Sequence, residues 1–192
     1  MGATGGLTED RDEEDSLLAR ARSGDGSAFE QLVELHAPAV YRIVAGHLGE
    51  TDAEDAAQEV FTRIFLGLKG FKGDARFATW VYRIATNVAL TRGKKKRRRL
   101  GFENSASPAP EPEAGEPGPH ESLARGEQRD AVRSAIEQLP EEFRAVVVLR
   151  GIEGLPFEEV ARVLGILRPT AESRMARAKE RLRTLLGRIM GD

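Results

Sequence analysis

Apolar residues recur at intervals of three and four positions along most of this chain. This spacing places them on one face of a helix and predicts four helices in the first half of the sequence. We expect the first to be capped by Ser16, the second to begin near Ser27 and the third to open at Thr51 or Asp52. The glycine-containing loop at 69–77 then precedes the fourth.

The second half of the chain shows the same periodicity. It predicts helices over about 127–138, 141–150 and 156–164, and a last one beginning near Thr170. Since no stretch alternates polar and apolar residues with the period of a strand, we expect an all-α protein.

A segment of different composition separates the two halves. Residues 100–122 are rich in Pro, Gly, Ser, Ala and Glu and contain few large apolar side chains, which predicts a flexible acidic linker. The expected organisation is therefore two small helical domains and two further segments. These are an acidic disordered tail (1–15), a first domain (16–99), a linker (100–126) and a second domain (127–192).

Composition excludes several classes of function. The chain has no cysteine, which excludes disulfides, thiol catalysis and cysteine-based zinc fingers and is compatible with a reducing compartment. We expect neither a membrane-spanning segment nor a signal peptide, because the apolar stretches are short and the first residues are acidic. The net charge of −2 averages unlike segments, since the run RGKKKRRR at 92–99 is suited to a polyanion.

The helices predicted at 156–164 and near 170–187 have the spacing of a helix-turn-helix, with Gly165 in the turn. Basic residues along the second helix are suited to phosphates and base edges. The alternative is an αα-hairpin whose basic face is merely solvated.

The basic run at 92–99 follows a helix and loop that carry Phe71, Phe77, Trp80 and Tyr82. Aromatic rings beside a basic track are typical of proteins that bind single-stranded nucleic acid. The alternative interpretation is that Phe77 and Trp80 belong to the core, because Trp80 shares a helical stripe with other apolar residues.

Four acidic residues, Asp52, Glu54, Asp55 and Glu59, lie close together in the third predicted helix. They lack a nearby histidine, so a charged helix face or a protein-docking face explains them better than a metal site does. We expect no cofactor and no enzymatic activity, since the sequence offers neither a ligand cluster nor a nucleophile nor a phosphate-binding glycine loop.

Two long motifs in this order resemble a known family. The strings DAEDAAQEVFTRIF (52–65) and FKGDARFATWVYRIATN (71–87) resemble region 2 of bacterial sigma factors. LPEEFRAVVVLRGIEGLPFEEVARVLGI (139–166) and the following SRMARAKERLR resemble region 4. Because only these two regions are present, the chain is similar to the extracytoplasmic-function (ECF) class of the sigma-70 family, and the two predicted domains correspond to its region 2 bundle and region 4 helix-turn-helix.

The resemblance implies that the protein acts in the cytoplasm and directs core RNA polymerase to promoters. Region 2 then docks on the clamp of the largest polymerase subunit and opens the −10 element around a flipped base, and region 4 binds the polymerase flap and the −35 element. It also implies an anti-sigma partner. The residues implied for core docking are Asp55, Gln58 and Glu59. Those implied for −10 DNA are Phe71, Lys72, Asp74, Phe77, Trp80, Arg83 and Asn87, with Arg92, Lys94, Lys95, Lys96, Arg97 and Arg98 on the DNA backbone.

The residues implied for −35 DNA are Arg168, Thr170, Glu172, Ser173, Arg174, Ala176 and Arg177. Three positions on this surface depart from the common family pattern: Pro169 replaces a turn glycine, Glu172 a basic residue and Ala176 a bulky one. We expect an altered −35 preference with the fold preserved. If Thr170 caps the last helix, Glu172 lies in its first turn, where it is able to stabilise the helix dipole, to accept a hydrogen bond from a cytosine amine, or both.

Three other functions explain the sequence less well. A helix-turn-helix regulator that never binds polymerase has no need of the motif at 52–65. A metal-dependent nuclease lacks its ligands. A sigma-like protein that binds polymerase or an anti-sigma partner without normal promoter recognition is supported only by Pro169, Glu172 and Ala176.

Overall fold

The structure is a computed structural model, and it describes residues 6–99 and 120–190 of the 192-residue chain. All regular elements in these two ranges are helical, as the periodicity predicts. The first range contains α1 (Gly6–Arg22), α2 (Gly26–Leu48), η1 (Glu50–Asp52), α3 (Ala53–Gly67), η2 (Leu68–Gly70) and α4 (Phe77–Arg99). The second contains α5 (His120–Glu137), α6 (Glu141–Val146), η4 (Val147–Ile152), α7 (Phe157–Leu164) and α8 (Arg168–Met190).

Local signals in the sequence explain how several of these helices begin and end. The Asp25 side chain accepts a hydrogen bond from the Ala28 amide at 3.1 Å and thereby caps α2. Gly165 has a φ of 65° and ends α7 in the left-handed conformation that glycine adopts without strain. Pro38 lies inside α2, which continues through it.

Several details of the predicted segments were wrong. Helix α1 begins at Gly6, so Ser16 lies within it and residues 6–15 are helical where a disordered tail was expected. Helix α5 begins at His120 and includes the end of the predicted linker, whose residues 100–119 lie outside the described part of the chain. The segment expected to be one helix over 141–150 is α6 continued by η4, which has π-helical hydrogen bonding.

Helix α8 begins at Arg168, two residues earlier than expected, and Thr170 is therefore not its N-cap. The amides of Thr170 and Ala171 both donate to the Leu167 carbonyl, at 3.0 and 3.1 Å. Pro169 consequently occupies the first helical turn, where its missing N–H and fixed φ are tolerated. Pro169 is thus accommodated within α8, and the turn between α7 and α8 is made at Gly165.

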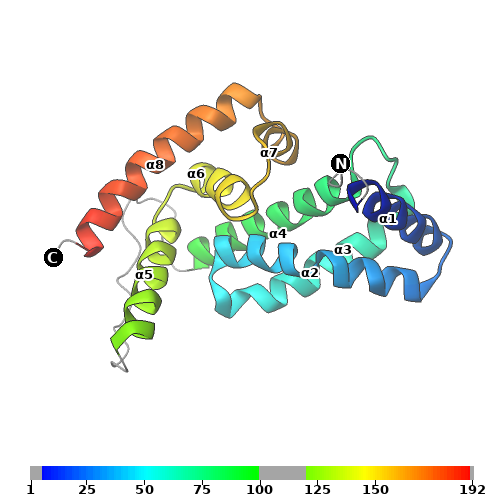
Figure 1. The fold of residues 1–192 in the computed structure, drawn as a ribbon, viewed down its shortest axis with the longest axis horizontal. Helices are drawn as coiled ribbons and strands as arrows, with labels where there is room; N and C mark the ends of the chain where they lie inside the picture. The colour runs from blue at the N-terminus through cyan, green and yellow to red at the C-terminus, as the bar shows by residue number, and fades with distance from the viewer. Residues whose placement is uncertain (1–5, 100–119, 191–192) are drawn as a thin grey trace.

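The two predicted domains pack against each other and share a core. Figure 1 shows α2, α3 and α4 running side by side, α7 lying over α4, and α8 projecting away from them. Helix α7 contacts α4, and η4 contacts α2. One cluster of buried apolar side chains accordingly includes Val81 and Val88 from α4 together with Val148 and Val160 from the second domain.

None of the helices in residues 6–99 and 120–190 is long and apolar enough to span a membrane.

Candidate nucleic-acid interface

Three aromatic rings expected at the −10 site pack on one another beneath the loop that joins η2 to α4. Phe71 and Phe77 are buried, with exposed fractions of 7% and 3%, and their ring centroids lie 5.6 Å apart. Trp80 is half-buried, 5.2 Å from Phe71 and 5.7 Å from Phe77. Phe77 is therefore a core residue in this structure, as the alternative interpretation predicts. The three rings pack together next to the loop.

The polar members of the same predicted set lie at the surface. Lys72 and Asp74 are exposed on either side of Gly73, whose φ of 80° makes the turn. Arg83 and Asn87 are exposed one helical turn apart on α4. The loop and α4 thus present positive charge and hydrogen-bonding groups at the surface, around the largely buried cluster of three aromatic side chains.

The basic run at 92–99 is the last part of α4, and carboxylates neutralise several of its cations. Arg92 Nε lies 2.6 Å from a Glu59 carboxylate oxygen, and Lys96 Nζ lies 2.7 Å from Asp52. These ion pairs hold α4 to α3 and η1. Because they are partly solvent-exposed, they are weak enough to exchange for DNA phosphates.

Two further cations of the run face the second domain. Lys94 and Arg97 both pair with Glu141 at the start of α6. Lys95 and Arg98 are exposed.

Two of the three residues expected to dock on polymerase are exposed on α3. These are Asp55 and Gln58. Glu59 is half-buried and accepts hydrogen bonds from Arg63 and Arg92, both at 2.6 Å. Its burial acts to raise the pKa of Glu59, but the hydrogen bonds and charges of the two arginines outweigh this and hold the pKa below its usual value. Glu59 therefore remains ionised and also ties α3 to α4.

Helices α7 and α8 form the predicted helix-turn-helix. The Ile166 amide donates to the Ala161 carbonyl at 3.0 Å across the turn, and Val160 and Ala171 are fully buried between the helices. This packing leaves one side of the first turns of α8 exposed.

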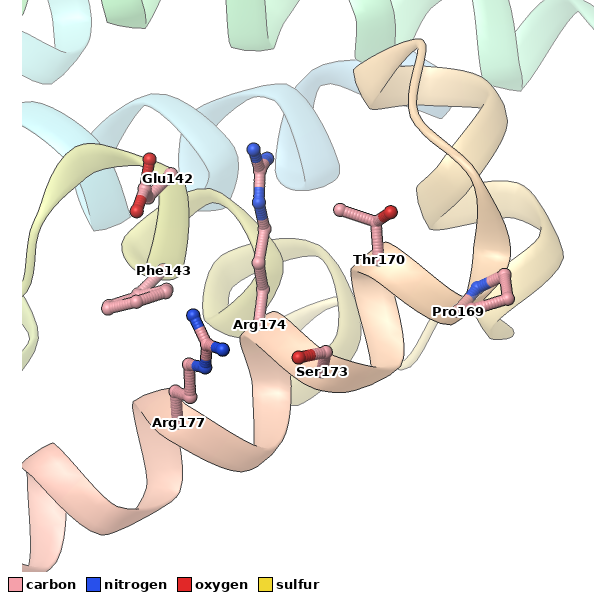
Figure 2. Close-up of a pocket in the computed structure, with 7 residues that line it drawn as sticks. All are labelled: Glu142, Phe143, Pro169, Thr170, Ser173, Arg174 and Arg177. Atoms are coloured by element: carbon pink, nitrogen blue, oxygen red, sulfur yellow. The ribbon is translucent and has the colours of Figure 1, made fainter.

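The exposed side of α8 carries the polar residues expected to bind −35 DNA. Four of these polar residues, all but Arg168 and Glu172, line a pocket of about 410 Å³ together with residues of α6. Figure 2 shows Arg174 and Arg177 pointing from α8 toward the side on which Glu142 and Phe143 of α6 lie, with Ser173 next to Arg174 on α8. Arginine side chains and hydroxyl groups that converge on one open surface are suited to binding phosphates and base edges. The pocket is lined by Glu142, Phe143, Pro169, Thr170, Ser173, Arg174 and Arg177.

Glu172 is engaged within the protein. Its carboxylate accepts a hydrogen bond from Arg168 Nε at 2.7 Å, and Arg168 also pairs with Glu158 of α7 at 2.7 Å. Ala176 is exposed beside this cluster. Binding of DNA by either Arg168 or Glu172 would therefore disturb the hydrogen bond between them. The two residues do not act as independent DNA contacts.

The sequence did not indicate the contacts that join the domains. Arg42 binds Glu153, which is 111 positions away, through two hydrogen bonds of 2.8 Å, and Thr79 donates to Glu159 at 2.7 Å. A long separation in sequence leaves no periodic signal, so pairs of this kind could not have been found without coordinates.

Histidine, aspartate and glutamate do not gather into a potential metal site anywhere in the described residues.

Family comparisons identify both halves of the molecule. The Sigma-70 region 2 family matches residues 32–99, and the Sigma-70, region 4 family matches residues 129–182. The chain is 32% identical to the RNA polymerase sigma-H factor of Pseudomonas aeruginosa over 91% of this chain and 93% of that protein. It is 34% identical to the ECF RNA polymerase sigma-E factor of Escherichia coli K12, over 85% of this chain and 89% of that protein.

Solved structures agree with this classification. A structure of CnrH in complex with the cytosolic domain of CnrY matches with a TM-score of 0.66 and 29% identity, over 91% of this chain and 97% of that one. The sigma factor RpoE, in complex with the anti-sigma factor NepR from Bartonella quintana, shares the fold with a TM-score of 0.62 and 23% identity, over 82% and 96% of the two chains. The chain therefore belongs to the ECF class of the sigma-70 family of transcription initiation factors.

Proposed function

We propose that this ECF sigma factor binds core RNA polymerase in the cytoplasm and directs it to promoters through two DNA contacts. The observation that carries the proposal is the presence, in one chain, of a region 2 unit with exposed acids on α3 and of a helix-turn-helix with an exposed arginine face. A DNA-binding regulator needs only the second of these.

The −10 element is proposed to bind at α4 and the loop before it. Lys72, Arg83 and Asn87 are exposed there, and the basic run continues along the same helix. Extruding a base from the duplex costs a few kcal/mol, and a pocket must recover this by stacking and hydrogen bonding. Because Phe71 and Phe77 are buried, Trp80 is the ring best placed to reach a base with a small movement.

The −35 element is proposed to bind the face of α8 shown in Figure 2. Arg174 and Arg177 supply charge-assisted donors there, and Thr170 and Ser173 supply hydroxyl groups. Region 4 is further proposed to contact the polymerase flap, as the family resemblance implies.

Core polymerase is proposed to dock on α3 through Asp55 and Gln58. We expect the double substitution Asp55→Ala with Gln58→Ala to weaken core binding at least tenfold, which is the effect of losing about 1.4 kcal/mol. Affinity is measured by titration with fluorescently labelled sigma factor. Glu30→Ala, at an exposed acid on α2, is the matched control, and equal affinities for the two variants would place the interface elsewhere.

An anti-sigma factor is proposed as the second partner. Both CnrH and RpoE share this fold. CnrH was solved in complex with the cytosolic domain of CnrY, and the sigma factor RpoE in complex with the anti-sigma factor NepR.

Run-off transcription with purified core polymerase on a genomic promoter library tests the main proposal. We expect discrete transcripts that depend on this protein. The double variant Arg174→Ala with Arg177→Ala should fail to produce them. Core binding without any promoter-dependent transcript would favour a second function, a protein that binds polymerase without normal promoter recognition. Pro169, Glu172 and Ala176 support that second function, since they alter the surface proposed to read the −35 element.

A further inference from the structure

A stripe of arginine side chains runs along one side of α8 and continues past the helix-turn-helix. It contains Arg174, Arg177, Arg181 and Arg188, whose spacings of three, four and seven positions keep them on one side of a helix. Arg174 and Arg177 belong to the face proposed to bind the −35 element. Arg181 and Arg188 have no role in that contact.

The arginine stripe is not neutralised within the described part of the protein. In residues 6–99 and 120–190, no carboxylate forms an ion pair with any of its four members. Arg168, less than two turns earlier on α8, shows the contrast, since it pairs with carboxylates of both α7 and α8. Because Arg177, Arg181 and Arg188 are also exposed, the stripe presents free positive charge at the surface.

Packing fixes the second half of the stripe on the second domain. The central carbon of the Arg181 guanidinium lies 5.1 Å from the centre of the Phe143 ring of α6, which is a cation–π contact. Leu182 and Leu185 pack against the buried apolar residues that α5, α6 and η4 contribute to this domain. Arg188 follows Leu185 by one turn, so its position on the domain is set by the same packing.

Helix α8 is longer than a base-reading contact requires. The region 4 family matches the chain up to residue 182, whereas α8 continues to Met190. With a rise of about 1.5 Å per residue, Arg188 lies about 21 Å beyond Arg174 along the helix axis. The major groove of DNA is about 12 Å wide, and a recognition helix reads it with its first turns. Residues this far along the helix therefore lie at the phosphate edge of the groove.

We propose that Arg181 and Arg188 bind phosphates of the duplex DNA that flanks the −35 element, and thereby anchor the second domain without reading sequence. This inference rests on the proposed function of α8. Guanidinium groups form charge-assisted hydrogen bonds with phosphate oxygens, and each neutralised phosphate releases counterions. Duplex DNA is the partner that fits, because the stripe is continuous with the face that holds Arg174 and Arg177.

The opposite flank of α8 carries a matched pair of cations. Lys179 and Arg183 are exposed, lie in the same turns as Arg181, and form no ion pair with another described residue. At about 100° per residue they point roughly away from the stripe. Removing them takes the same charge from the same half of the helix, so they distinguish a located DNA contact from the general attraction of a basic helix.

The anchor is tested by the salt dependence of DNA binding. The probe is a fluorescein-labelled, random-sequence duplex of about three helical turns, titrated with the full chain and followed by fluorescence anisotropy. We expect Arg181→Ala with Arg188→Ala to bind about tenfold more weakly than the wild type. The slope of log affinity against log salt should fall by about 1.8, because each phosphate contact contributes about 0.9. Lys179→Ala with Arg183→Ala should keep the wild-type slope, and an equal loss in both variants overturns the proposal.

Two further variants separate the charge of the stripe from its packing. Arg181→Lys with Arg188→Lys keeps both charges and should bind the duplex within about twofold of the wild type, since lysine also binds phosphate. Weak binding by this variant contradicts a phosphate contact. Arg188→Ala alone leaves the contact of Arg181 with Phe143 intact and should lower the salt slope by about 0.9. An unchanged slope there removes Arg188 from the DNA contact.

Base preference separates the anchor from base reading. Holoenzymes assembled from core polymerase and each variant select promoters from a library with a randomised −35 element. The Arg181→Ala, Arg188→Ala holoenzyme is expected to select the same bases as the wild type and to release them at lower salt. A changed base preference would assign the two arginines to base reading and contradict a sequence-independent anchor.

The same measurements distinguish a failure of the anchor from a failure of the proposed function. A wild-type holoenzyme that selects no −35 sequence contradicts the proposed function of α8, whereas the salt slopes on the random duplex still test the stripe. If the Arg181→Ala, Arg188→Ala variant binds DNA as the wild type does but binds core polymerase more weakly, the stripe contacts a protein and the proposal is wrong.

Discussion

At the scale of single residues, the state of Glu172 in the free protein is set by its neighbours. Because α8 begins at Arg168, Glu172 lies beyond the first turn, where the helix dipole has little effect, and it accepts a hydrogen bond from Arg168, which also pairs with Glu158. A carboxylate held in this way stabilises the helix through its ion pair with Arg168, and it also belongs to the set of residues expected to bind −35 DNA. The two roles make different predictions about substitution.

Glu172→Lys is expected to lower the free energy of unfolding by about 0.5 kcal/mol, because it places two like charges four residues apart on α8. If Glu172 also reads a base, the bases selected at the corresponding −35 position should change. Urea unfolding measures the first effect and selection of promoters from a randomised −35 library the second. Glu172→Gln, which keeps the shape of the side chain, is the matched variant, and an identical base preference in all three proteins would restrict Glu172 to a structural role.

His47 is a second such residue, because its surroundings determine whether it is protonated. It is 5% exposed at the end of α2, and burial together with the positive charge of Arg144 lowers its pKa from 6.5 to about 3. The folded protein therefore keeps this imidazole neutral under conditions in which the unfolded chain would protonate it.

Acid is expected to destabilise the protein through His47. The unfolded chain takes up a proton below pH 6.5 and the folded chain does not until about pH 3. The stabilisation is thus complete above pH 6.5 and is lost as pH falls toward 3, by about 2 kcal/mol at pH 5. Urea unfolding at pH 7 and pH 5 measures this, with His47→Gln as the reference. An equal loss in both proteins would assign the acid sensitivity to other groups.

At the scale of secondary-structure elements, residues with special backbone requirements decide where helices end. Gly165 ends α7 with a positive φ, and Pro169 lies in the first turn of α8, which begins at Arg168. The sequence indicated the end of α7 correctly, because glycine after an apolar periodic stretch is a strong signal. It placed the start of α8 too late, because Thr170 is a good capping residue and propensity alone could not exclude it.

Gly165→Ala is expected to destabilise the second domain by about 1 kcal/mol. No atom lies within 4 Å of a Cβ at this position, so the cost comes from the left-handed backbone alone. Gly187→Ala in α8 is the control, since its surroundings are also open and its φ is that of a helix; there alanine should stabilise by about 0.5–1 kcal/mol. Urea unfolding that showed the same sign for both substitutions would contradict the argument.

At the scale of the whole molecule, ion pairs and buried apolar side chains join the two domains into one body. The pair of Arg42 and Glu153 differs from the surface pairs because the carboxylate is almost fully buried. Glu153 also raises the pKa of Arg42 through their hydrogen bonds, which keeps the guanidinium charged. Loss of Arg42 would leave a buried charge without its partner, which is costly.

Arg42→Ala is expected to reduce the free energy of unfolding by about 2 kcal/mol. Arg20→Ala removes an ion pair with Asp25 that is more exposed on its acidic side and lies within one domain, and is expected to cost much less. Adding Glu153→Ala to Arg42→Ala should recover part of the loss, because no buried charge then remains unpaired. A double-mutant cycle by urea unfolding measures the coupling, and additive effects would show that the pair contributes nothing specific.

The sequence by itself determined the helical class of the protein, the division into two regions and the family. The spacing of apolar residues defines helix faces locally, and the motifs at 52–87 and 139–166 are long enough to be specific. It also placed the polar surface residues Arg83, Asn87 and Arg174 in the sets now proposed to bind DNA.

Only the tertiary structure decided which of those residues are accessible. Whether Phe71 and Phe77 face solvent or core, and whether Arg83 and Arg97 are available, depends on contacts between segments far apart in the chain. Such contacts arise from the summed packing of several helices, and no local pattern encodes them. The close packing of η4 against α2 at Gly46 is the clearest case, because a glycine within a helix gives no sign of what will lie against it.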